Sequence, residues 1–275
     1  MSTTIEKAFV RQFEAEVHLA YQRQGSKLRP TVRSKTGVRG SSTTFQRVGK
    51  GRAALKGRHG KIPVMNLEYS DPVECALQDW YAGEWIDRLD ELKTNNEERQ
   101  VVVNSAAYAL GRKTDDLVIG ALTGASGITT QTVATAAAFN MSAVLNVFEV
   151  LGGREVPDDG ERFAIVGWKQ WSKLLSLDEF SSADYVGEEN LPFRDFQARR
   201  WLGTTWMPHS GLPVSASRRA CFWYHRAAIG HAAGSEVATD ISWHGDRAAH
   251  FVNSMMSQGV CVIDTDGVVR FDVAE

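Results

Sequence analysis

The chain has 275 residues, 43% of them hydrophobic, and carries 31 basic and 33 acidic side chains for a formal net charge of −2. This length supports one large domain or two modest ones without disulfide bonds. Because Cys75, Cys221 and Cys261 are widely spaced, form no CxxC pair and follow no apolar signal segment, we expect a reduced, cytosolic protein. No stretch approaches the roughly 18 apolar residues that span a bilayer, so no membrane partner is expected.

The near-neutral total conceals an uneven charge distribution. Residues 17–67 contain no Asp or Glu and hold twelve of the thirty-one Lys and Arg, for a charge of +12. The other 224 residues hold nineteen basic and thirty-three acidic side chains, for a charge of −14. Such a split indicates a polyanionic partner for the basic segment, which is either nucleic acid or the acidic body of a neighbouring copy.

The N-terminal third predicts a helix followed by a long basic arm. Apolar side chains at three-to-four spacing predict an amphipathic helix over 5–24. Cationic and other side chains then alternate over 27–35, and a second alternating run covers 62–69, with glycine-rich sequence between them. Residues 26–70 therefore predict a two-stranded arm with a flexible basic tip. An isolated hairpin of this length is marginal in water, so we expect it to lie on another molecule.

The central part of the chain predicts two helices. A capping box at Thr94–Glu97 begins a helix over about 95–121, and a second helix runs over about 130–151 and stops at Gly152-Gly153. The remaining predicted elements are a strand over 162–166, a helix over 168–175, an irregular stretch over 181–200, apolar runs over 201–206 and 221–224, and a closing hairpin of 259–263 and 268–273 around an Asp-Gly turn.

This order of elements and two local stretches carry a family resemblance. The stretches are Asn104-Ser-Ala-Ala-Tyr-Ala-Leu-Gly-Arg-Lys-Thr-Asp-Asp116 and Ala248-Ala-His-Phe-Val-Asn-Ser-Met-Met-Ser-Gln-Gly259. The chain resembles a tailed-bacteriophage major capsid protein of the Hong Kong 97 type. The resemblance implies an α+β fold with an N-terminal arm at 1–25, an extended two-stranded loop at 26–72, a peripheral domain at 73–157 and 246–275 with a spine helix over about 95–121, and an axial domain at 158–245.

The same resemblance implies the function and the partners. It implies a structural protein that self-assembles into the icosahedral head of a tailed phage around double-stranded DNA. The expected partners are copies of itself in pentamers and hexamers, a portal and packaged DNA held non-specifically, with a decoration protein as a further candidate. Because the N-terminus is too short for a fused scaffolding segment, we expect a separate scaffolding protein. The expected location is the virion, after assembly in the host bacterial cytoplasm.

In this interpretation the extended loop lies on the adjacent subunit, where charge registers the contact and apolar burial supplies most of the affinity. Leu28 and Val32 are expected to bury there as well. The predicted contact residues are Arg29, Arg33, Lys35, Phe45, Arg47, Lys50, Arg52, Arg58, Met65 and Leu67.

Two other classes of function are open. A nucleic-acid-binding protein could use residues 17–67 as a phosphate clamp, although few aromatic side chains near the arm could stack on bases. A metal-dependent hydrolase could use His244, Asp246 and His250, although their spacing matches no established ligand signature. The chain has no GxSxG, Walker A, GxGxxG or HExxH motif, so we expect no enzyme activity and no cofactor. Asp115 and Asp116 point about 100° apart on a helix, which favours a surface or salt-bridge role.

Overall fold

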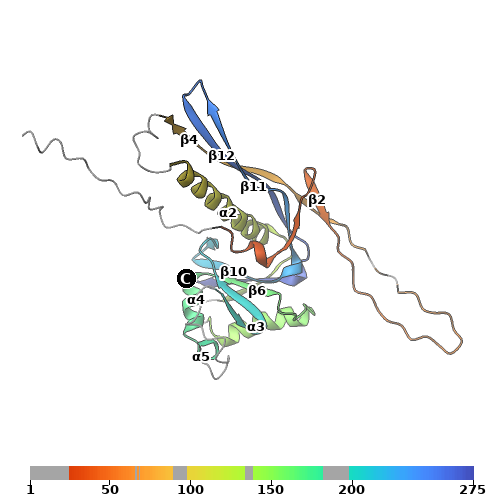
Figure 1. The fold of residues 1–275 in the computed structure, drawn as a ribbon. Helices are drawn as coiled ribbons and strands as arrows, with labels where there is room; N and C mark the ends of the chain where they lie inside the picture. Colours follow the sequence, from red (N-terminus) through yellow and green to blue (C-terminus); the bar gives the residue numbers. More distant parts are fainter. Residues whose placement is uncertain (1–24, 66, 68, 89–97, 134–138, 182–197) are drawn as a thin grey trace, which may run out of the picture. The chain divides into compact units, whose positions relative to one another are not determined.

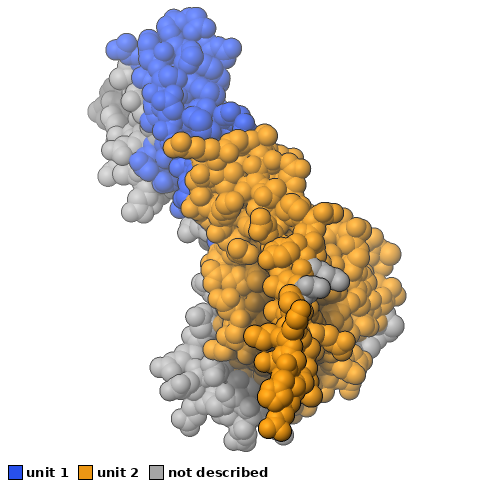
Figure 2. All heavy atoms as spheres, turned by 90° about the vertical axis from the view of Figure 1, so that its right-hand side faces the viewer, with its two compact units in different colours: residues 1–26, 79–113, 236–256 blue, residues 27–78, 114–235, 257–275 orange. Residues whose placement is uncertain are grey.

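The computed structural model describes residues 25–65, 67, 69–88, 98–133, 139–181 and 198–275 (Figure 1). The helix predicted over 5–24, the capping box at Thr94–Glu97 and most of the stretch predicted to be irregular lie outside these residues. Figure 2 colours two compact units: residues 1–26, 79–113 and 236–256 form unit 1, and residues 27–78, 114–235 and 257–275 form unit 2. None of the described helices is long and apolar enough to cross a membrane.

Unit 1 contains a long helix and three strands. The helix α2 (Glu98–Gly124) belongs to it up to residue 113, and the presence of a helix over about 95–121 is confirmed for the described residues. The strand β12 (Ala249–Val262) lies between β11 (Ile229–His244) and β4 (Gln78–Asp87). Of these strands, β11 belongs to unit 1 from residue 236 and β12 up to residue 256. An aromatic cluster packs this unit, because the Trp85 and Phe251 ring centroids lie 4.6 Å apart. A Cβ at Gly83 would lie 2.5 Å from the Phe251 ring, so any larger residue there would have to displace this ring.

The core of unit 2 is a sheet in which seven described strands take part. Its order is β5 (Thr129–Val133), β13 (Val268–Ala274), β10 (Arg218–His225), β6 (Arg162–Val166), β8 (Thr204–Pro208) and β7 (Arg199–Trp201), with β9 (Val214–Ser215) paired to β10. β13 pairs parallel to β5 and antiparallel to β10, and β6 pairs parallel to β8. The predicted strand over 162–166 is confirmed.

The helices of unit 2 pack beside this sheet and close its core (Figure 1). They are the last part of α2 from residue 114, α3 (Met141–Gly153), α4 (Trp168–Leu175) and the single turn α5 (Asp178–Ser181). The helix predicted over 168–175 is confirmed by α4. Phe148 of α3 lies 6.0 Å from Trp223 of β10, measured between ring centroids. Trp206 and Trp223 are fully buried at 4.8 Å from each other, so these tryptophans serve the core as aromatic side chains of this size commonly do.

The predicted start of the second helix, at about residue 130, is wrong. The segment predicted to begin a helix at residue 130 is instead the strand β5, because Thr129, Thr130, Thr132 and Val133 are β-branched and suit a strand. The helix α3 starts later, where the Asn140 side chain accepts a hydrogen bond of 3.2 Å from the Ala143 N–H.

The prediction of a closing hairpin is also wrong, because the two strands that would form it belong to different sheets. The predicted turn is present as the short helix η6 (Thr265–Gly267), and the Asp264 side chain accepts from the Asp266 N–H at 3.1 Å. However, β12 pairs with β11 and β4, whereas β13 pairs with β10 and β5. The turn therefore carries the chain from one sheet to the other. A buried face on β13 that fits between β5 and β10 outweighs the local hairpin signal.

The long two-stranded arm is wrong in both halves, because the described residues of the run predicted over 62–69 form no strand and Tyr69 takes part only in an isolated β-bridge to Val48. Residues 29–31 form the short helix η2 (Arg29–Thr31), and Leu28 and Val32 are buried in the core of unit 2. Pro30 lacks the N–H that a strand ladder needs. The following strand β1 (Arg33–Thr36) pairs in parallel with β11, from Arg33 opposite Gly230 to Thr36 opposite Ala233. The hydroxyl-rich stretch predicted as part of the tip forms β2 (Ser42–Phe45), which pairs antiparallel with β3 (Val73–Ala76).

Candidate subunit interface

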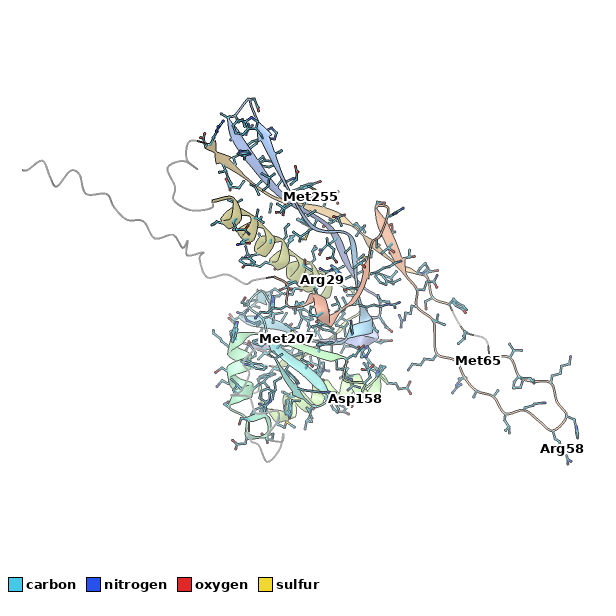
Figure 3. All side chains as sticks on the ribbon, viewed as in Figure 1. Arg29, Arg58, Met65, Asp158, Met207 and Met255 are labelled. Carbon is cyan, nitrogen blue, oxygen red and sulfur yellow. The ribbon has the colours of Figure 1, made fainter. Side chains whose placement is uncertain are left out.

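The extended loop, defined here as residues 46–72, connects β2 to β3, and its described residues form no helix or strand. A β-bridge joins Val48 to Tyr69, and the Ser70 N–H donates to the Arg47 carbonyl at 3.3 Å. The loop reverses in a turn closed by the Gly60 N–H on the Gly57 carbonyl at 3.0 Å. Figure 3 labels Arg58 in this turn and Met65 on the returning limb, with their side chains as sticks.

The loop exposes large apolar side chains to an unusual extent. Leu55 is 98% exposed, Ile62 76% and Val64 82%. Further exposed apolar residues of the loop are Val48, Met65, Leu67 and Tyr69. Apolar groups gathered in this way commonly mark a surface that another protein covers. The predicted contact residues Met65 and Leu67 therefore lie where a partner can reach them.

The loop extends from a ribbon, formed by β2 and β3, that is seated on the parts of β11 and β12 that belong to unit 2. Glycines face the ribbon at three points. A Cβ at Gly230 would lie 2.7 Å from the Phe45 ring, one at Gly234 3.2 Å from a Leu77 methyl, and one at Gly259 2.0 Å from the Ala76 carbonyl oxygen. Phe45, Cys75, Ala232 and Ile263 form a small buried cluster at this contact. Side-chain-free positions on β11 and β12 thus allow the ribbon backbone to approach closely.

A buried carboxylate holds the chain where it enters this region. Asp115 of α2 is fully buried, and its Oδ1 accepts from the Leu28 N–H at 3.0 Å while Oδ2 accepts from the Lys27 N–H at 3.2 Å. His209 Nε2 donates to Oδ2 at 3.2 Å, because His209 Nδ1 accepts from the Gly211 N–H at 3.1 Å. The predicted surface role is therefore wrong for Asp115, which is a buried carboxylate held by two backbone donors and the His209 N–H.

The next residues are fixed by a second buried contact. The Thr31 hydroxyl lies 2.6 Å from the Tyr224 hydroxyl and donates to the Leu28 carbonyl at 2.6 Å. Burial raises the pKa of the Tyr224 hydroxyl, so it remains neutral. Residues 27–32 are therefore part of the body of unit 2, and the part of the chain free to reach a neighbour begins later than predicted.

The cations of the predicted contact occupy three kinds of environment. Lys35 donates to the Thr43 hydroxyl at 2.7 Å, and the Arg33 guanidinium lies 5.8 Å from the Phe45 ring centroid. Arg47 pairs with Asp264 at 3.1 Å, and Lys50 pairs with Glu155 in the same unit. Arg52 and Arg58 lie exposed in the loop. The structure thus brings Arg33, Lys35 and Phe45 together around a hollow of about 460 Å³ and leaves the distal cations apart from them.

Three apolar residues predicted to bury against a neighbour are instead buried inside their own chain. Phe45 is 4% exposed, Leu28 0% and Val32 1%. Phe45 packs on Gly230 of β11, and Leu28 and Val32 belong to the main core of unit 2. The alternating pattern over 27–35 correctly identified Leu28 and Val32 as positions on an apolar face, but a surface within the same chain covers them and Phe45.

The residues considered for a metal site have other roles. In unit 1, His250 packs on Trp243 at 4.9 Å and His244 on Trp85 at 5.0 Å, measured between ring centroids. Asp246 Oδ1 lies 3.9 Å from His244 Nδ1, beyond hydrogen-bond distance. The aromatic neighbours explain both imidazoles as packing groups.

Within the described residues, one other group, Asp159, Glu161 and His225, brings three potential ligand atoms within 4.8 Å of one another. His225 Nδ1 accepts from the Ala227 N–H at 3.2 Å, which caps the short helix η5 (Arg226–Ala228). Its Nε2 therefore carries the proton and donates to Asp159 Oδ1 at 3.1 Å. A metal ion would need that nitrogen without its proton, so the geometry fits a hydrogen-bonded cap and not a metal site.

Sequence reasoning missed the residues that hold the base of the loop. The period-two series of small residues Gly230, Ala232 and Gly234 was a usable signal, because small residues on one strand face mark a close backbone approach. Asp115 gave no such signal, since its partners lie 87 or more residues away.

Comparison with protein families matches residues 5–275 to a family described as phage capsid protein. The chain belongs to this family. The phage capsid protein has the α+β fold expected of the Hong Kong 97 type, and its role is that of a major capsid structural protein. No curated protein matches it.

Solved structures share the fold of this capsid protein over nearly its whole length. The capsid structure of cyanophage P-SCSP1u is 14% identical with a TM-score of 0.77, covering 100% of this chain and 96% of that one. A chain from Mycobacterium phage Che8 is 16% identical with a TM-score of 0.72, covering 96% and 97%. The capsid of Ralstonia phage GP4 is 14% identical with a TM-score of 0.71, covering 96% and 95%.

Proposed function

We propose that this capsid protein self-assembles into the icosahedral head of a tailed phage around double-stranded DNA, and that it does so by laying its extended loop on a neighbouring subunit. The observation that carries this proposal is the exposure of Leu55, Ile62 and Val64 in a loop that is rich in cations. Its role is structural and not enzymatic. The similarity to solved phage capsids supports assembly with copies of itself.

Apolar burial supplies most of the affinity in the proposed contact. Covering a side chain such as Ile62 or Val64 contributes about 1.5–3 kcal/mol. Several such side chains in one loop can offset the cost of ordering it. Within its own chain the loop leaves Leu55, Ile62 and Val64 largely uncovered. A second copy of the chain is the occupant that a repeating shell provides next to every loop.

Charge selects the surface on which the loop lies. Residues 17–67 carry +12, and the rest of the chain carries −14, so each copy presents both signs. Opposite potentials steer association and fix the register of an interface. Arg52 and Arg58 are the cations proposed to meet acidic groups of the neighbour. Arg29, Arg33 and Lys35 belong to the proposed contact as flanking groups near the base of the loop.

The chain on both sides of the loop is anchored to unit 2, which favours binding of the loop to a neighbour. Asp115 holds Lys27 and Leu28, and the ribbon of β2 and β3 is seated on β11 and β12. Fixing both ends of a loop reduces the conformational freedom lost when its tip binds. A short interface repeated over many subunits then becomes durable through multivalency.

We also propose the division into a peripheral and an axial domain, with its limits moved to follow the sheets. The helix α2 and the strands β4, β11 and β12 are assigned to the peripheral domain. The seven-stranded sheet of unit 2 with α3 and α4 is assigned to the axial domain, which meets its copies in pentamers and hexamers. What supports this change is that β13, predicted as peripheral, pairs with both β5 and β10 of that sheet.

The remaining partners follow from the function proposed. Assembly is proposed to occur in the host bacterial cytoplasm with a separate scaffolding protein and a portal, and a decoration protein is a further candidate. Packaged DNA is proposed to be contacted non-specifically.

Electron microscopy and sedimentation of the purified chain test the function directly. The expected result is closed shells, or pentamers and hexamers that convert to shells. An Ile62→Ser and Val64→Ser double variant is expected to keep the subunit folded but to assemble poorly, whereas an Arg52→Lys control assembles normally. A strictly monomeric protein that binds DNA tightly, with unchanged affinity in the double variant, would instead support the phosphate clamp.

A further inference from the structure

Two of the three cysteines meet at the base of the extended loop. Cys75 lies on β3 and is 1% exposed, and Cys261 lies on β12 and is half-buried. Cys261 packs against the small buried cluster to which Cys75 belongs. Both belong to unit 2, and both are reduced in this structure.

The position of Gly259 shows independently that these thiols share one face. A Cβ at Gly259 would lie 3.3 Å from Cys75 Sγ, so that sulfur lies over β12 at this residue. Side chains two residues apart on a strand point to the same side. Cys261 is two residues from Gly259 and therefore projects toward the same ribbon. The absence of a side chain at Gly259 lets β3 come close enough for the two sulfurs to meet.

The surroundings of the pair favour reaction at Cys75. The hydrogen bond from Cys261 lowers the pKa of the Cys75 thiol, and the same contact raises the pKa of Cys261. Thiolate character therefore concentrates on Cys75, and the thiolate is the reactive form. The third cysteine differs, because burial raises the pKa of Cys221 to about 12. Cys221 Sγ lies 3.8 Å from the Arg219 carbonyl and has no described thiol neighbour.

We propose that Cys75 and Cys261 are an oxidation site that closes to an intrachain disulfide when the protein meets a peroxide, and that this bond fastens the base of the extended loop to β12. The inference that the bond forms does not depend on the proposed function. Only its consequence for the loop rests on that proposal. A reducing cytosol would keep the pair as thiols, and oxidising surroundings would close it.

The reaction balances with hydrogen peroxide as the oxidant. The Cys75 thiol loses its proton, and its sulfur attacks one peroxide oxygen, giving a sulfenic acid while hydroxide leaves and takes up a proton to become water. The Cys261 thiol then loses its proton, and its sulfur attacks Cys75 Sγ and displaces the sulfenic oxygen as a second water. The two thiols lose two electrons and two hydrogens, and one peroxide becomes two waters.

Thiol counting and peptide mapping test the bond. After peroxide treatment, denaturation and alkylation, the wild-type chain is expected to show one reactive cysteine in place of three, and a peptide pair joined between Cys75 and Cys261. A Cys221→Ser variant is expected to form the same link, and a Cys75→Ser variant to form none. Retention of three alkylatable thiols in the wild type, or disulfides between chains only, would overturn the proposal.

A stability measurement tests whether the bond fastens the base of the loop. Oxidised wild-type protein is expected to unfold at a higher urea concentration than reduced protein, with the difference removed by dithiothreitol. The Cys261→Ser variant is expected to show no shift with peroxide. If the mapped bond forms and the urea midpoint stays unchanged, the fastening part of the proposal is wrong. Failure of shell assembly in either redox state would bear on the proposed function and leave the bond itself standing.

Discussion

The N–H of Leu28 donates a hydrogen bond of 3.0 Å to Oδ1 of Asp115, 87 residues further along the chain, and both residues are fully buried. This contact joins the segment that leads into the extended loop to the helix α2. Asp115 also accepts from the Lys27 N–H and from His209. A buried carboxylate is stable only when such donors surround it. The segment that precedes β1 and β2 is thus fixed by a buried carboxylate inside unit 2.

Replacing Asp115 with Asn is expected to destabilise the subunit by about 3–5 kcal/mol, the typical cost of breaking a buried charge network. The amide of Asn would place N–H groups against donors that now meet carboxylate oxygens. Thermal unfolding of the isolated subunit measures the effect. Asp116→Asn, at the exposed neighbouring position, is the control and is expected to change stability little. Equal unfolding temperatures for the two variants would contradict this role of Asp115.

Gly259→Ala is expected to push the ribbon of β2 and β3 away from β12. A Cβ there would lie 2.0 Å from the Ala76 carbonyl oxygen, and a backbone atom cannot move aside as a flexible side chain can. We expect a loss of about 1–3 kcal/mol, as for overpacking in other cores, measured by urea unfolding. Gly120→Ala in α2 is the matched control, because a Cβ there meets nothing within 4 Å and alanine favours a helix by about 1 kcal/mol. The prediction fails if Gly259→Ala is as stable as that control.

Lowering the pH is expected to reduce the folding stability of unit 2 by protonating Glu275. Its hydrogen bond with Arg219, 2.5 Å long, lowers the pKa of the carboxyl below its ordinary value of 4.5. Because the folded pKa is the lower one, the pair stabilises the fold above pH 4.5, and this contribution is lost as pH falls through the folded pKa.

Unfolding temperatures at neutral pH and below pH 4 measure this contribution in the wild type and in Glu275→Gln. The wild type is expected to lose more stability on acidification than the variant, by a small margin, because the carboxyl lies near the surface. Identical pH profiles for the two proteins would show that the pair with Arg219 does not contribute.

Reversing the charges at Arg52 and Arg58 is expected to slow shell assembly and to reduce its dependence on salt. Opposite charges steer subunits together, and added salt screens that attraction. The double variant with Glu at both positions is compared with one carrying Lys, which keeps the charge. Light scattering at two salt concentrations follows the assembly rate. If the Glu and Lys variants assemble at the same rate, the distal cations do not guide the contact.

Sequence patterns predicted well the elements whose partners are local. The helix Trp168–Leu175 and the strand Arg162–Val166 follow from short amphipathic and apolar runs. The spine helix was predicted because apolar side chains recur along it at helical spacing. The family and its fold were also predicted, because the order of the predicted elements along the chain, together with two local stretches, resembled that of the family.

Patterns failed where distant residues decide the structure. Alternation over 27–35 predicted a strand, but Pro30 cannot join a ladder and Asp115 captures the Lys27 and Leu28 amides. The Asp-Gly turn predicted a hairpin, but β13 inserts between β5 and β10. The exposed loop was predicted from its charge, whereas its seat on Gly230, Gly234 and Gly259 required the fold. Local periodicity shows that a face is apolar and does not show what covers it.

A shortened loop tests the central claim most directly. A Cβ at Gly51 would lie 2.4 Å from Met65 Sδ, so the two limbs are adjacent there and residues 52–64 can be removed by joining Gly51 to Met65. Electron microscopy then compares this variant with the wild type at equal concentration. We predict a folded subunit with an unchanged urea midpoint that forms no stable shells. Normal shells from the shortened chain would contradict the account.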